Sequence, residues 1–284
     1  YIAPETLENA FFKRKLRLLN ISQIAIDEAH CVSMWGHDFR KSYGLIAEFI
    51  DNLRIRPVVT AFTATATEIV RKDVINLLKL RNPYICIGSF DRENLEIKLY
   101  IEEDKLELVK DIIREREGEA GIIYCATRKE VDGLYYYLKD LGYDVLKYHG
   151  GLKDSEKEFY QDEFLNENSN VMIATNAFGM GIDKSNVRYV IHYNMPQSME
   201  NYYQEAGRAV RDGENSQCVL LFSAQDVMID RMLLDNKDFS DVDEEDEFLI
   251  RQRDIRRLQI MEGYCKTTGC LRNYILEYFG EKTF

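Results

Sequence analysis

The sequence lacks both long hydrophobic runs and an excess of positive charge. No stretch approaches the ~18 uninterrupted apolar residues that a membrane span requires, and the chain does not open on a charged-then-apolar leader. We therefore expect no membrane partner. The 284 residues carry a formal net charge of −12, which taken alone argues against a protein that binds nucleic acid through a basic surface.

The negative charge is concentrated in one segment. Residues 235–247 contain eight acidic residues and one lysine, so this segment supplies −7 of the net −12. Such a run is usually a solvated linker or loop, and we predict one here. Elsewhere positive charge is local, at Arg40, Lys41, Arg208 and Arg211. A DNA track on this protein would therefore be a groove rather than a basic face.

Cysteine is also sparse, with six residues scattered along the chain. Four of them lie in apolar runs, which is typical of buried, reduced thiols. This pattern favours a reducing cytosol, so we predict a cytoplasmic protein. The length fits about two domains.

Short apolar segments rich in β-branched residues alternate with helical patterns along the chain. Strands are predicted at residues 21–26, 57–62, 121–125, 143–148, 171–175, 187–193 and 218–222. This alternation indicates an α/β fold, with parallel sheets covered by helices on both faces. Two such blocks join near residues 89–94. Ligands of these sheets bind beyond the carboxyl ends of the strands.

Capping signals predict where two of the helices begin. Thr65 and Glu68 have the spacing of a capping box, and Thr127 and Glu130 repeat it. The second helix is expected to stop at Gly142, because glycine is a common C-terminal cap.

An acidic pair follows the first predicted strand, in the segment Asp27-Glu28-Ala29-His30. At a strand end, Asp27 can hold the water shell of a Mg²⁺ ion while Glu28 reaches a water aimed at a γ-phosphate. The four residues alone leave a plainer alternative open. An acidic pair at a helix start is often only a cap, and His30 alone is more often structural than a ligand.

Further motifs occur in a fixed order after this pair. They are residues 35–40 (WGHDFR), 63–65 (TAT), 174–175 (AT), 178–183 (FGMGID) and 204–213 (QEAGRAVRDG). Together with the DEAH segment, they resemble the RecQ family within helicase superfamily 2. The resemblance implies tandem RecA-like domains, the first incomplete, at residues 1–92 and 93–225. The helical start of a zinc-binding subdomain is expected at residues 226–284.

The resemblance implies an ATP-dependent 3′→5′ DNA helicase that couples hydrolysis to single-strand translocation and duplex unwinding in recombination and repair. Asp27 would then coordinate Mg²⁺, Glu28 would orient the attacking water, and His30 would link the site to the second domain. Arg208 and Arg211 resemble arginine fingers, a role that suits the permanently charged, planar guanidinium. The resemblance assigns the coupling of ATP to domain movement to Thr63, Thr65, Gly181, Asp183 and Gln204.

DNA contacts are implied at both blocks. In the first, Trp35 and Phe39 offer faces for base stacking and Arg40 offers a phosphate partner; the alternative is that both aromatics belong to the core. In the second, paired glycines let backbone amides approach phosphates. The residues expected to contact DNA are Trp35, His37, Phe39, Arg40, His149, Thr175 and Asn176. The partners implied are single-stranded and branched DNA, bound by a monomer.

The sequence departs from the family pattern in several places. There is no G-x-x-x-x-G-K-[ST], and the chain opens without Met, so we expect a fragment that does not bind ATP productively by itself. Val210 replaces the usual glycine between the two arginines, and would misplace Arg211 if that position required a positive φ. Cys270 matches the first zinc ligand and Cys265 does not. Zinc needs four ligands, so this chain is not expected to hold it stably. The winged-helix module that typically follows in the family is also absent.

Two other classes of function remain open on the sequence. One is a non-catalytic nucleic-acid-binding or adaptor protein that keeps the helicase fold. The other is a metallohydrolase built on Asp27 and Glu28, which would need further ligands although the chain has only four histidines.

Overall fold

A computed structural model describes residues 1–36, 38–179, 183–239 and 243–282. The chain divides into two compact units. Unit 1 comprises Tyr1–Phe90 and Leu276–Phe284, and unit 2 comprises Asp91–Ile275. His37 and Gly181, two of the residues predicted to act in the site, lie outside the described residues.

Unit 1 is built on a pair of parallel strands, β1 (Gln23–Ile26) and β2 (Val58–Ala61). Its helices are η1 (Pro4–Glu8), α1 (Ala10–Leu16), η2 (Ala29–Val32), η3 (Lys41–Tyr43), α2 (Gly44–Asp51) and α3 (Glu68–Leu77). A buried cluster including Ile26, Phe49, Ile50, Val70 and Leu78 holds the strands and helices together.

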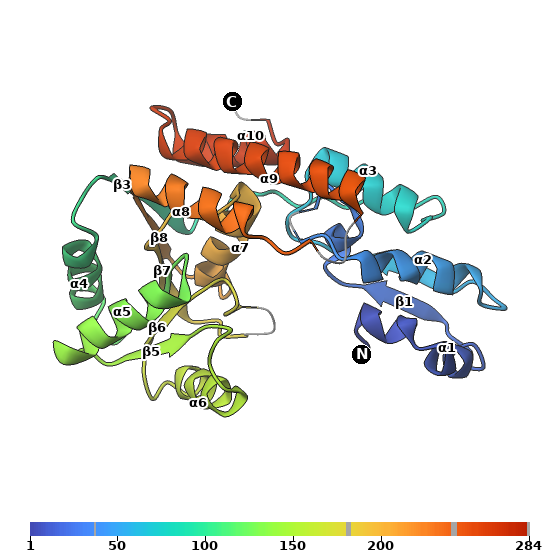
Figure 1. Ribbon diagram of the computed structural model, residues 1–284, viewed down its shortest axis with the longest axis horizontal. Coiled ribbons are helices and arrows are strands. Elements are labelled where there is room, and N and C mark those ends of the chain that lie inside the picture. Colours follow the sequence, from blue (N-terminus) through green and yellow to red (C-terminus); the bar gives the residue numbers. More distant parts are fainter. Residues whose placement is uncertain (37, 180–182, 240–242, 283–284) are drawn as a thin grey trace. The chain divides into compact units, whose positions relative to one another are not determined.

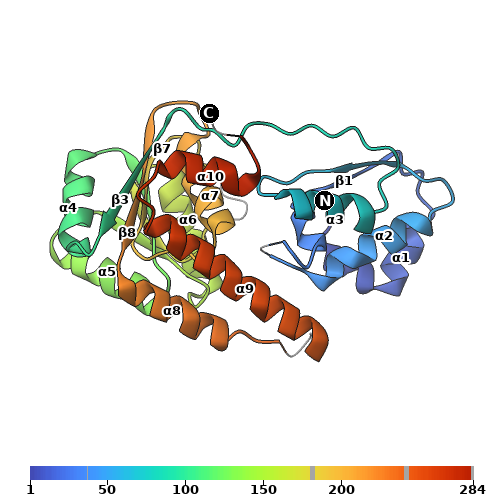
Figure 2. The ribbon, with the colours of Figure 1, turned by 90° about the horizontal axis from the view of Figure 1, so that it is seen from above.

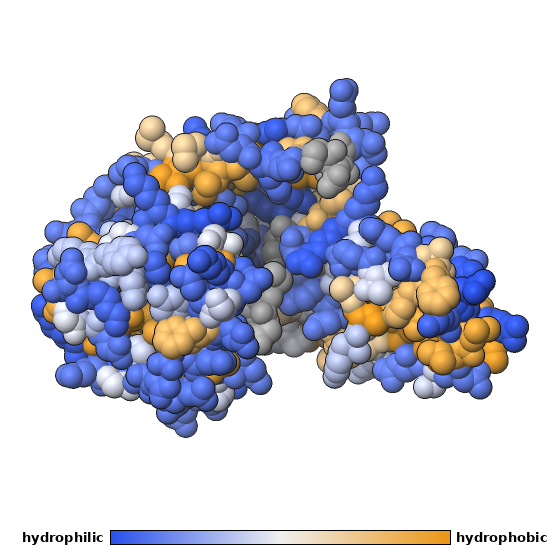
Figure 3. All heavy atoms as spheres, turned by 60° about the horizontal axis from the view of Figure 1, so that its bottom comes forward, coloured by the Kyte–Doolittle hydropathy of each residue, from blue (hydrophilic) through white to orange (hydrophobic). Residues whose placement is uncertain are grey.

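Much of the hydrophobic side-chain surface of unit 1 remains exposed. Val58 at the start of β2 is 65% exposed and Phe62 just after it is 57% exposed. Other exposed apolar residues of this unit are Phe11, Leu18, Leu19 and Ile55, and Figure 3 shows hydrophobic atoms gathered on it. Parallel strands are normally buried on both faces, so this short sheet lacks the usual cover among the described residues.

Unit 2 contains a six-stranded sheet in the order β3-β8-β7-β4-β6-β5, with every neighbouring pair parallel. The strands are β3 (Leu95–Ile101), β4 (Ala120–Tyr124), β5 (Val145–Tyr148), β6 (Val171–Ala174), β7 (Val187–His192) and β8 (Ser216–Phe222). The helices are α4 (Lys105–Glu115), α5 (Arg128–Asp140), α6 (Asp154–Leu165), α7 (Met199–Ala206), η4 (Gly207–Val210), α8 (Ala224–Asp235), α9 (Glu244–Cys265) and α10 (Leu271–Phe279), whose residues from Leu276 on belong to unit 1 (Figure 1).

The two faces of this sheet are covered by different helices, because successive strand residues point to opposite sides. Val219 and Leu221 of β8 lie in one buried cluster with the apolar residues of α4 and α5. Cys218 of the same strand points the other way, and its thiol lies 3.5 Å from the hydroxyl of Tyr202 on α7. The long helix α9 runs beside α8 on the outside of this unit (Figure 2).

The α/β fold and the predicted strands are confirmed. The capping box of Thr127 and Glu130 is confirmed at the start of α5. The capping box predicted at Thr65 is wrong. Helix α3 begins only at Glu68, with Thr67 as its N-cap and no side-chain cap bond.

The predicted acidic linker is shorter than expected. Residues 244–247 form the first turn of α9 rather than a loop. Four carboxylates in that turn are favourable, because the N-terminus of a helix carries partial positive charge. Among the described residues, none of the helices combines the length and apolar character needed to cross a bilayer.

Candidate nucleotide and nucleic-acid site

The acidic pair after β1 lies on a sharp backbone turn. Glu28 adopts a left-handed conformation, with φ 47° and ψ 44°, which is unusual for a residue with a side chain and marks a functional constraint or local strain. The Asp27 carboxylate accepts a hydrogen bond from the Glu28 amide at 2.9 Å. The hydroxyl of Tyr43 donates to the Asp27 carbonyl at 3.2 Å. The Asp27 side chain is therefore exposed, while the hydrogen bond from Tyr43 fixes its backbone.

His30 connects this turn to the segment that follows β2. Its buried imidazole lies 3.0 Å from the hydroxyl of Thr63, measured at Nδ1, and 3.4 Å from Oε2 of Glu28. The amide of Ala29 donates to the carbonyl of Phe62 at 2.8 Å, which holds the two segments in register. The structure thus brings Glu28, His30 and Thr63 together. Thr65 is buried close by, and its amide donates to the Thr63 hydroxyl at 3.4 Å.

The loop after η2 is tightly folded around a glycine. A Cβ on Gly36 would lie 2.1 Å from the carbonyl oxygen of His30, so no side chain fits there without displacement of the backbone. The Ser33 hydroxyl donates to Asp73 at 2.5 Å and accepts from the Trp35 amide at 3.0 Å. Trp35 itself is 47% exposed. The alternative that Trp35 is a core residue is therefore wrong.

The end of this loop does not present a free cation. The guanidinium of Arg40 donates to one carboxylate oxygen of Asp38 from Nε at 3.1 Å and from Nη2 at 2.8 Å. Phe39 is half-buried. A phosphate at Arg40 would therefore compete with Asp38, although both side chains remain partly exposed.

In unit 2, His149 lies just after β5, where the paired glycines begin. Its Nδ1 accepts from the amide of Gly151 at 3.1 Å, and its Nε2 lies 3.5 Å from Asp132. Asp132 also accepts from the buried Lys147 at 2.6 Å. Burial alone would raise the pKa of Asp132, but the Lys147 ammonium lowers it. His149 is thus a buried support for the turn, because its ring and its carbonyl accept from the amides of Gly151 and Leu152.

The segment after β6 carries the next predicted residues. Thr175 is buried and its amide donates to the Tyr148 carbonyl at 3.1 Å, whereas Asn176 is exposed. Further along, Arg208 from η4 donates to the Gly179 carbonyl at 2.8 Å. Gly179 has φ 156°, and a Cβ there would lie 2.1 Å from the Arg208 guanidinium. Arg208 is only 8% exposed, so it is packed against this loop rather than extended.

Asp183 and Arg211, which the resemblance placed in the nucleotide site, lie together. Arg211 Nη1 is 3.3 Å from Asp183 Oδ1, with side-chain exposures of 35% and 95%. Gln204 is half-buried on α7, one helical turn before Arg208. Arg211 is therefore the more accessible of the two arginines.

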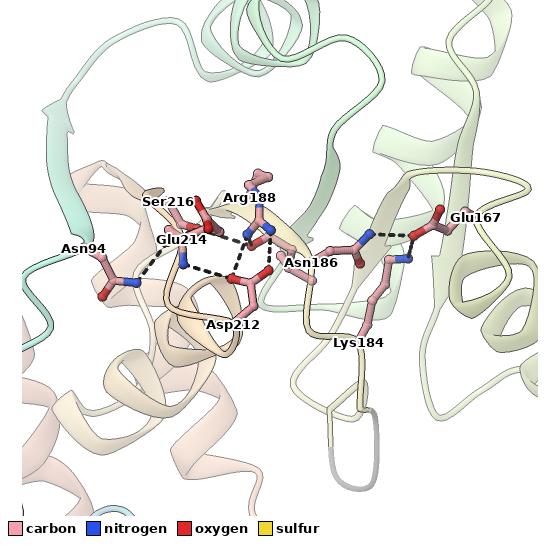
Figure 4. Close-up of polar contacts among 9 residues, drawn as sticks. Asn94, Glu167, Lys184, Asn186, Arg188, Asp212, Glu214 and Ser216 are labelled. Atoms are coloured by element: carbon pink, nitrogen blue, oxygen red, sulfur yellow. Dashed lines mark hydrogen bonds and ion pairs between the residues drawn. The ribbon is translucent and has the colours of Figure 1, made fainter.

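Two sets of polar contacts anchor the segments that carry this pair (Figure 4). Arg188 at the start of β7 forms a two-pronged ion pair with Asp212, one prong of which measures 3.2 Å. The Arg188 guanidinium lowers the pKa of Asp212. On the other side, Glu167 accepts from Lys184 at 3.4 Å and from Asn186 at 2.5 Å. The residues next to Arg211 and Asp183 are thereby fixed to the sheet.

The concern about Val210 is not supported by the backbone. Val210 ends the 3₁₀ helix η4, and it is not among the described residues with positive φ. A β-branched side chain is compatible with this conformation. The valine therefore does not by itself misplace Arg211.

A buried polar network behind α7 was missed by sequence reasoning. His192 at the end of β7 lies 2.9 Å from the carboxylate of Glu205, measured at Nε2. Its Nδ1 is 3.7 Å from the thiol of Cys218, and the hydroxyl of Tyr264 donates to Tyr202 at 3.2 Å. Burial alone would lower the pKa of His192, but Cys218 and Glu205 raise it to about 9. These residues are far apart in the sequence, and no local pattern indicates the network.

The predicted ligands of zinc and of magnesium have different surroundings in the structure. No group of three or more His, Cys, Asp or Glu side chains in the described part of the chain is arranged to hold a metal ion. Cys270 is exposed between α9 and α10, and Cys265 is buried at the end of α9. These residues do not make up the four ligands of structural zinc. Magnesium is different, because it is often held by one or two carboxylates together with substrate phosphates, and the exposed Asp27 carboxylate suits that role.

Similarity to solved structures shows which fold this is. The chain matches Saccharomyces cerevisiae Dbp5 bound to RNA and ADP–BeF3 with a TM-score of 0.60 and 20% identity, over 89% of this chain and 67% of that one. It matches the Mycobacterium smegmatis helicase Lhr, bound to ssDNA and AMP-PNP, with a TM-score of 0.62 and 18% identity, over 82% and 33% of the two chains. The fold is therefore the RecA-like fold of helicases.

Sequence similarity narrows the class to one family. The helicase conserved C-terminal domain matches residues 104–213, and the RecQ zinc-binding domain matches residues 224–284. The ATP-dependent DNA helicase RecQ of Bacillus subtilis is 45% identical over 282 residues, which cover 99% of this chain and 46% of the relative. The RecQ-like DNA helicase BLM of Xenopus laevis is 39% identical over 299 residues, or 100% and 21% of the two chains. The chain belongs to the RecQ family, and it spans less than half the length of these relatives.

Proposed function

We propose that this protein works as an ATP-dependent 3′→5′ DNA helicase, in which hydrolysis drives movement along one strand and separation of a duplex. The observation that carries the proposal is the arrangement after β1. There the carboxylate of the left-handed Glu28 lies 3.4 Å from Nδ1 of the buried His30. The same nitrogen lies 3.0 Å from the Thr63 hydroxyl. Relatives named as DNA helicases over nearly all of this chain support the same activity.

In this proposal the exposed Asp27 carboxylate would hold Mg²⁺, which neutralises charge on the phosphates of ATP. Glu28 accepts a proton from the attacking water, or orients it, at a position fixed by the turn. His30 is too buried to meet the nucleotide. It instead couples the position of the Glu28 carboxylate to Thr63. The amide of Thr65, which donates to the Thr63 hydroxyl, extends this coupling to the segment that follows β2.

The two arginines of unit 2 are proposed to stabilise charge on the γ-phosphate. Arg211 would exchange its ion pair with the exposed Asp183 for phosphate, and loss of that pair costs little because exposed ion pairs contribute little. Arg208 would have to leave the Gly179 carbonyl. Gln204, on the preceding turn, and Gly181 complete the proposed ATP-coupling set.

DNA contacts are proposed on both units. The exposed Trp35 ring would stack on a base, with Phe39, His37 and Arg40 beside it in the loop. In unit 2, the amides that follow His149 and the exposed Asn176 after Thr175 would meet the DNA backbone. Such main-chain and neutral contacts are compatible with a net charge of −12.

The remaining assignments are proposals of the same kind. Residues 1–92 and 93–225 would form the two RecA-like domains, and residues 226–284 the start of the zinc-binding subdomain. Cys270 would be one of four zinc ligands in a longer chain. We also propose a monomer that acts in the cytoplasm on single-stranded and branched DNA.

The test is single-strand-stimulated ATP hydrolysis by the full-length protein, with Glu28→Gln as the probe. We expect kcat to fall by about 100-fold or more, the range for loss of a general base, while single-strand binding persists. The matched control is Glu48→Gln, which alters an exposed carboxylate of α2 in the same unit. Unwinding of a duplex with a 3′ tail, and not of one with a 5′ tail, tests the polarity. A wild-type protein that binds DNA without hydrolysing ATP would instead indicate the non-catalytic adaptor.

A further inference from the structure

Arg92 lies at the beginning of unit 2, three residues before β3, and its side chain packs on α7. Its guanidinium carbon lies 4.1 Å from the centre of the Tyr203 ring, and its Nε donates to the Tyr203 hydroxyl at 3.1 Å. A planar guanidinium can stack on an aromatic face and also donate a hydrogen bond from Nε, which the ammonium group of lysine cannot do in this way.

The same guanidinium reaches the residue that precedes Arg208. A Cβ built on Gly207 would lie 1.8 Å from Nη1 of Arg92 and 2.6 Å from its Cζ. Gly207 has an ordinary right-handed backbone, with φ −64° and ψ −9°. Any advantage of glycine at this position is therefore steric, because a side chain there would displace the Arg92 guanidinium. Arg92 occupies the volume that a side chain at position 207 would need.

The backbone that carries Arg92 is itself fixed. Arg272 of α10 donates from Nη1 to the Asp91 carboxylate at 2.5 Å and to the Arg92 carbonyl at 2.7 Å. Its Nη2 donates to the Leu95 carbonyl at 2.6 Å. Three hydrogen bonds from one planar group leave this segment little freedom to shift.

Two further contacts tie the same segment to the chain that follows η4. The side-chain amide of Asn94 donates to the Glu214 carbonyl at 2.9 Å, and the amide of Ser216 donates to the Asn94 carbonyl at 2.9 Å (Figure 4). Residues 92–94 thus contact the chain just before η4 and again a few residues after it.

We propose that Arg92 is a positioning residue, which holds η4 so that Arg208 and Arg211 are presented in register to the nucleotide. It acts through Tyr203 and Gly207 and does not itself meet ATP. Arg272 holds Arg92 in turn, so α10 contributes to the placement of η4. This inference rests on the proposed function, in which Arg208 and Arg211 stabilise charge on the γ-phosphate.

The first test is a double-mutant cycle on ATP hydrolysis by the full-length protein. Arg92→Ala should lower kcat by about 10-fold to 100-fold, as expected for a shift of reacting groups by about 1 Å, and leave KM for ATP within about twofold. In an Arg208→Ala background, Arg92→Ala should lower kcat by a smaller factor than in the wild-type protein, because only the placement of Arg211 is then left to lose and residues that act through one another are not additive. The matched control is Arg116→Ala, which removes a local ion pair with Glu119 at 2.9 Å elsewhere in unit 2.

The second test is hydrogen exchange of the amides of residues 203–211 in this 284-residue chain, which requires no activity. Arg92→Ala should speed their exchange by about 10-fold or more, through local opening, whereas Arg116→Ala should not. The proposal is overturned if exchange is unchanged, or if Arg92→Ala lowers kcat equally with and without Arg208. A wild-type protein that hydrolyses no ATP would refute the proposed function, while the exchange result would still decide the placement of η4.

Discussion

The buried ion pair between Lys105 and Asp226 is predicted to contribute strongly to the stability of unit 2. Lys105, in the first turn of α4, donates to both carboxylate oxygens of Asp226 at 2.9 and 2.8 Å and to the carbonyl of Tyr193 at 2.7 Å. Asp226 lies in the first turn of α8 and its side chain is 2% exposed. The pair therefore joins two helices at the carboxyl edge of the sheet.

Lys105→Met removes the ammonium and leaves the carboxylate buried. Breaking a buried pair by removing one partner costs about 3–5 kcal/mol of unfolding free energy. Asp226 would keep two donors, the Ser223 amide at 2.9 Å and the Asn194 side chain at 3.0 Å. We therefore expect the lower end, about 3 kcal/mol, which is about a 100-fold change in the folding equilibrium.

The assay is urea unfolding followed by circular dichroism, together with hydrogen exchange at β7 and β8 to locate the loss in unit 2. The control is Lys98→Met, because Lys98 pairs with Glu96 at 3.3 Å and both side chains are well exposed. That change should cost less than about 1 kcal/mol. If Lys105→Met costs no more than the control, the contact between α4 and α8 does not stabilise the unit as argued.

Three further outcomes are expected. Gly207→Ala should cost about 1–3 kcal/mol of stability through overpacking, and Arg92→Ala should relieve that cost in the double variant; equal losses in both backgrounds would contradict the steric argument. Because the pKa of His192 is raised to about 9 by its partners, including Glu205, its stabilising effect should be complete below about pH 6.5 and be lost as the pH rises through 9. His192→Gln should flatten this decline in urea midpoints, and a parallel decline would exclude His192 as its source. Gly142→Ala should cost about 1 kcal/mol in thermal unfolding, since φ there is 85° and side chains disfavour it.

Most strands of unit 2 could be predicted because their apolar runs are buried on both faces. The exception was β3, Leu95–Ile101, whose sequence LEIKLYI alternates polar and apolar residues. It lies at the edge of the sheet beside β8 and is only half-buried. An edge strand loses the continuous hydrophobic run that identified the others, so the pattern passed unnoticed.

The candidate site could be predicted only as far as its motifs are local. Asp27, Glu28 and His30 are close in sequence, whereas the contact of His30 with Thr63 joins two strand ends and was not predicted. The contact of Arg92 with Tyr203 joins residues 111 positions apart, and nothing beside either residue indicates it. The wrong capping box at Thr65 has a similar cause. Thr65 is buried near Thr63, so tertiary contacts and not helix capping determine its place.

The exposed indole of Trp35 gives the protein a built-in optical probe. It is the only tryptophan in the chain, so tryptophan emission from the unlabelled protein comes from one side chain in the loop after η2. Its partly exposed ring should emit at long wavelength when free and be quenched by a stacked base. A titration with single-stranded DNA would therefore report occupancy of that loop alone, without attachment of a dye.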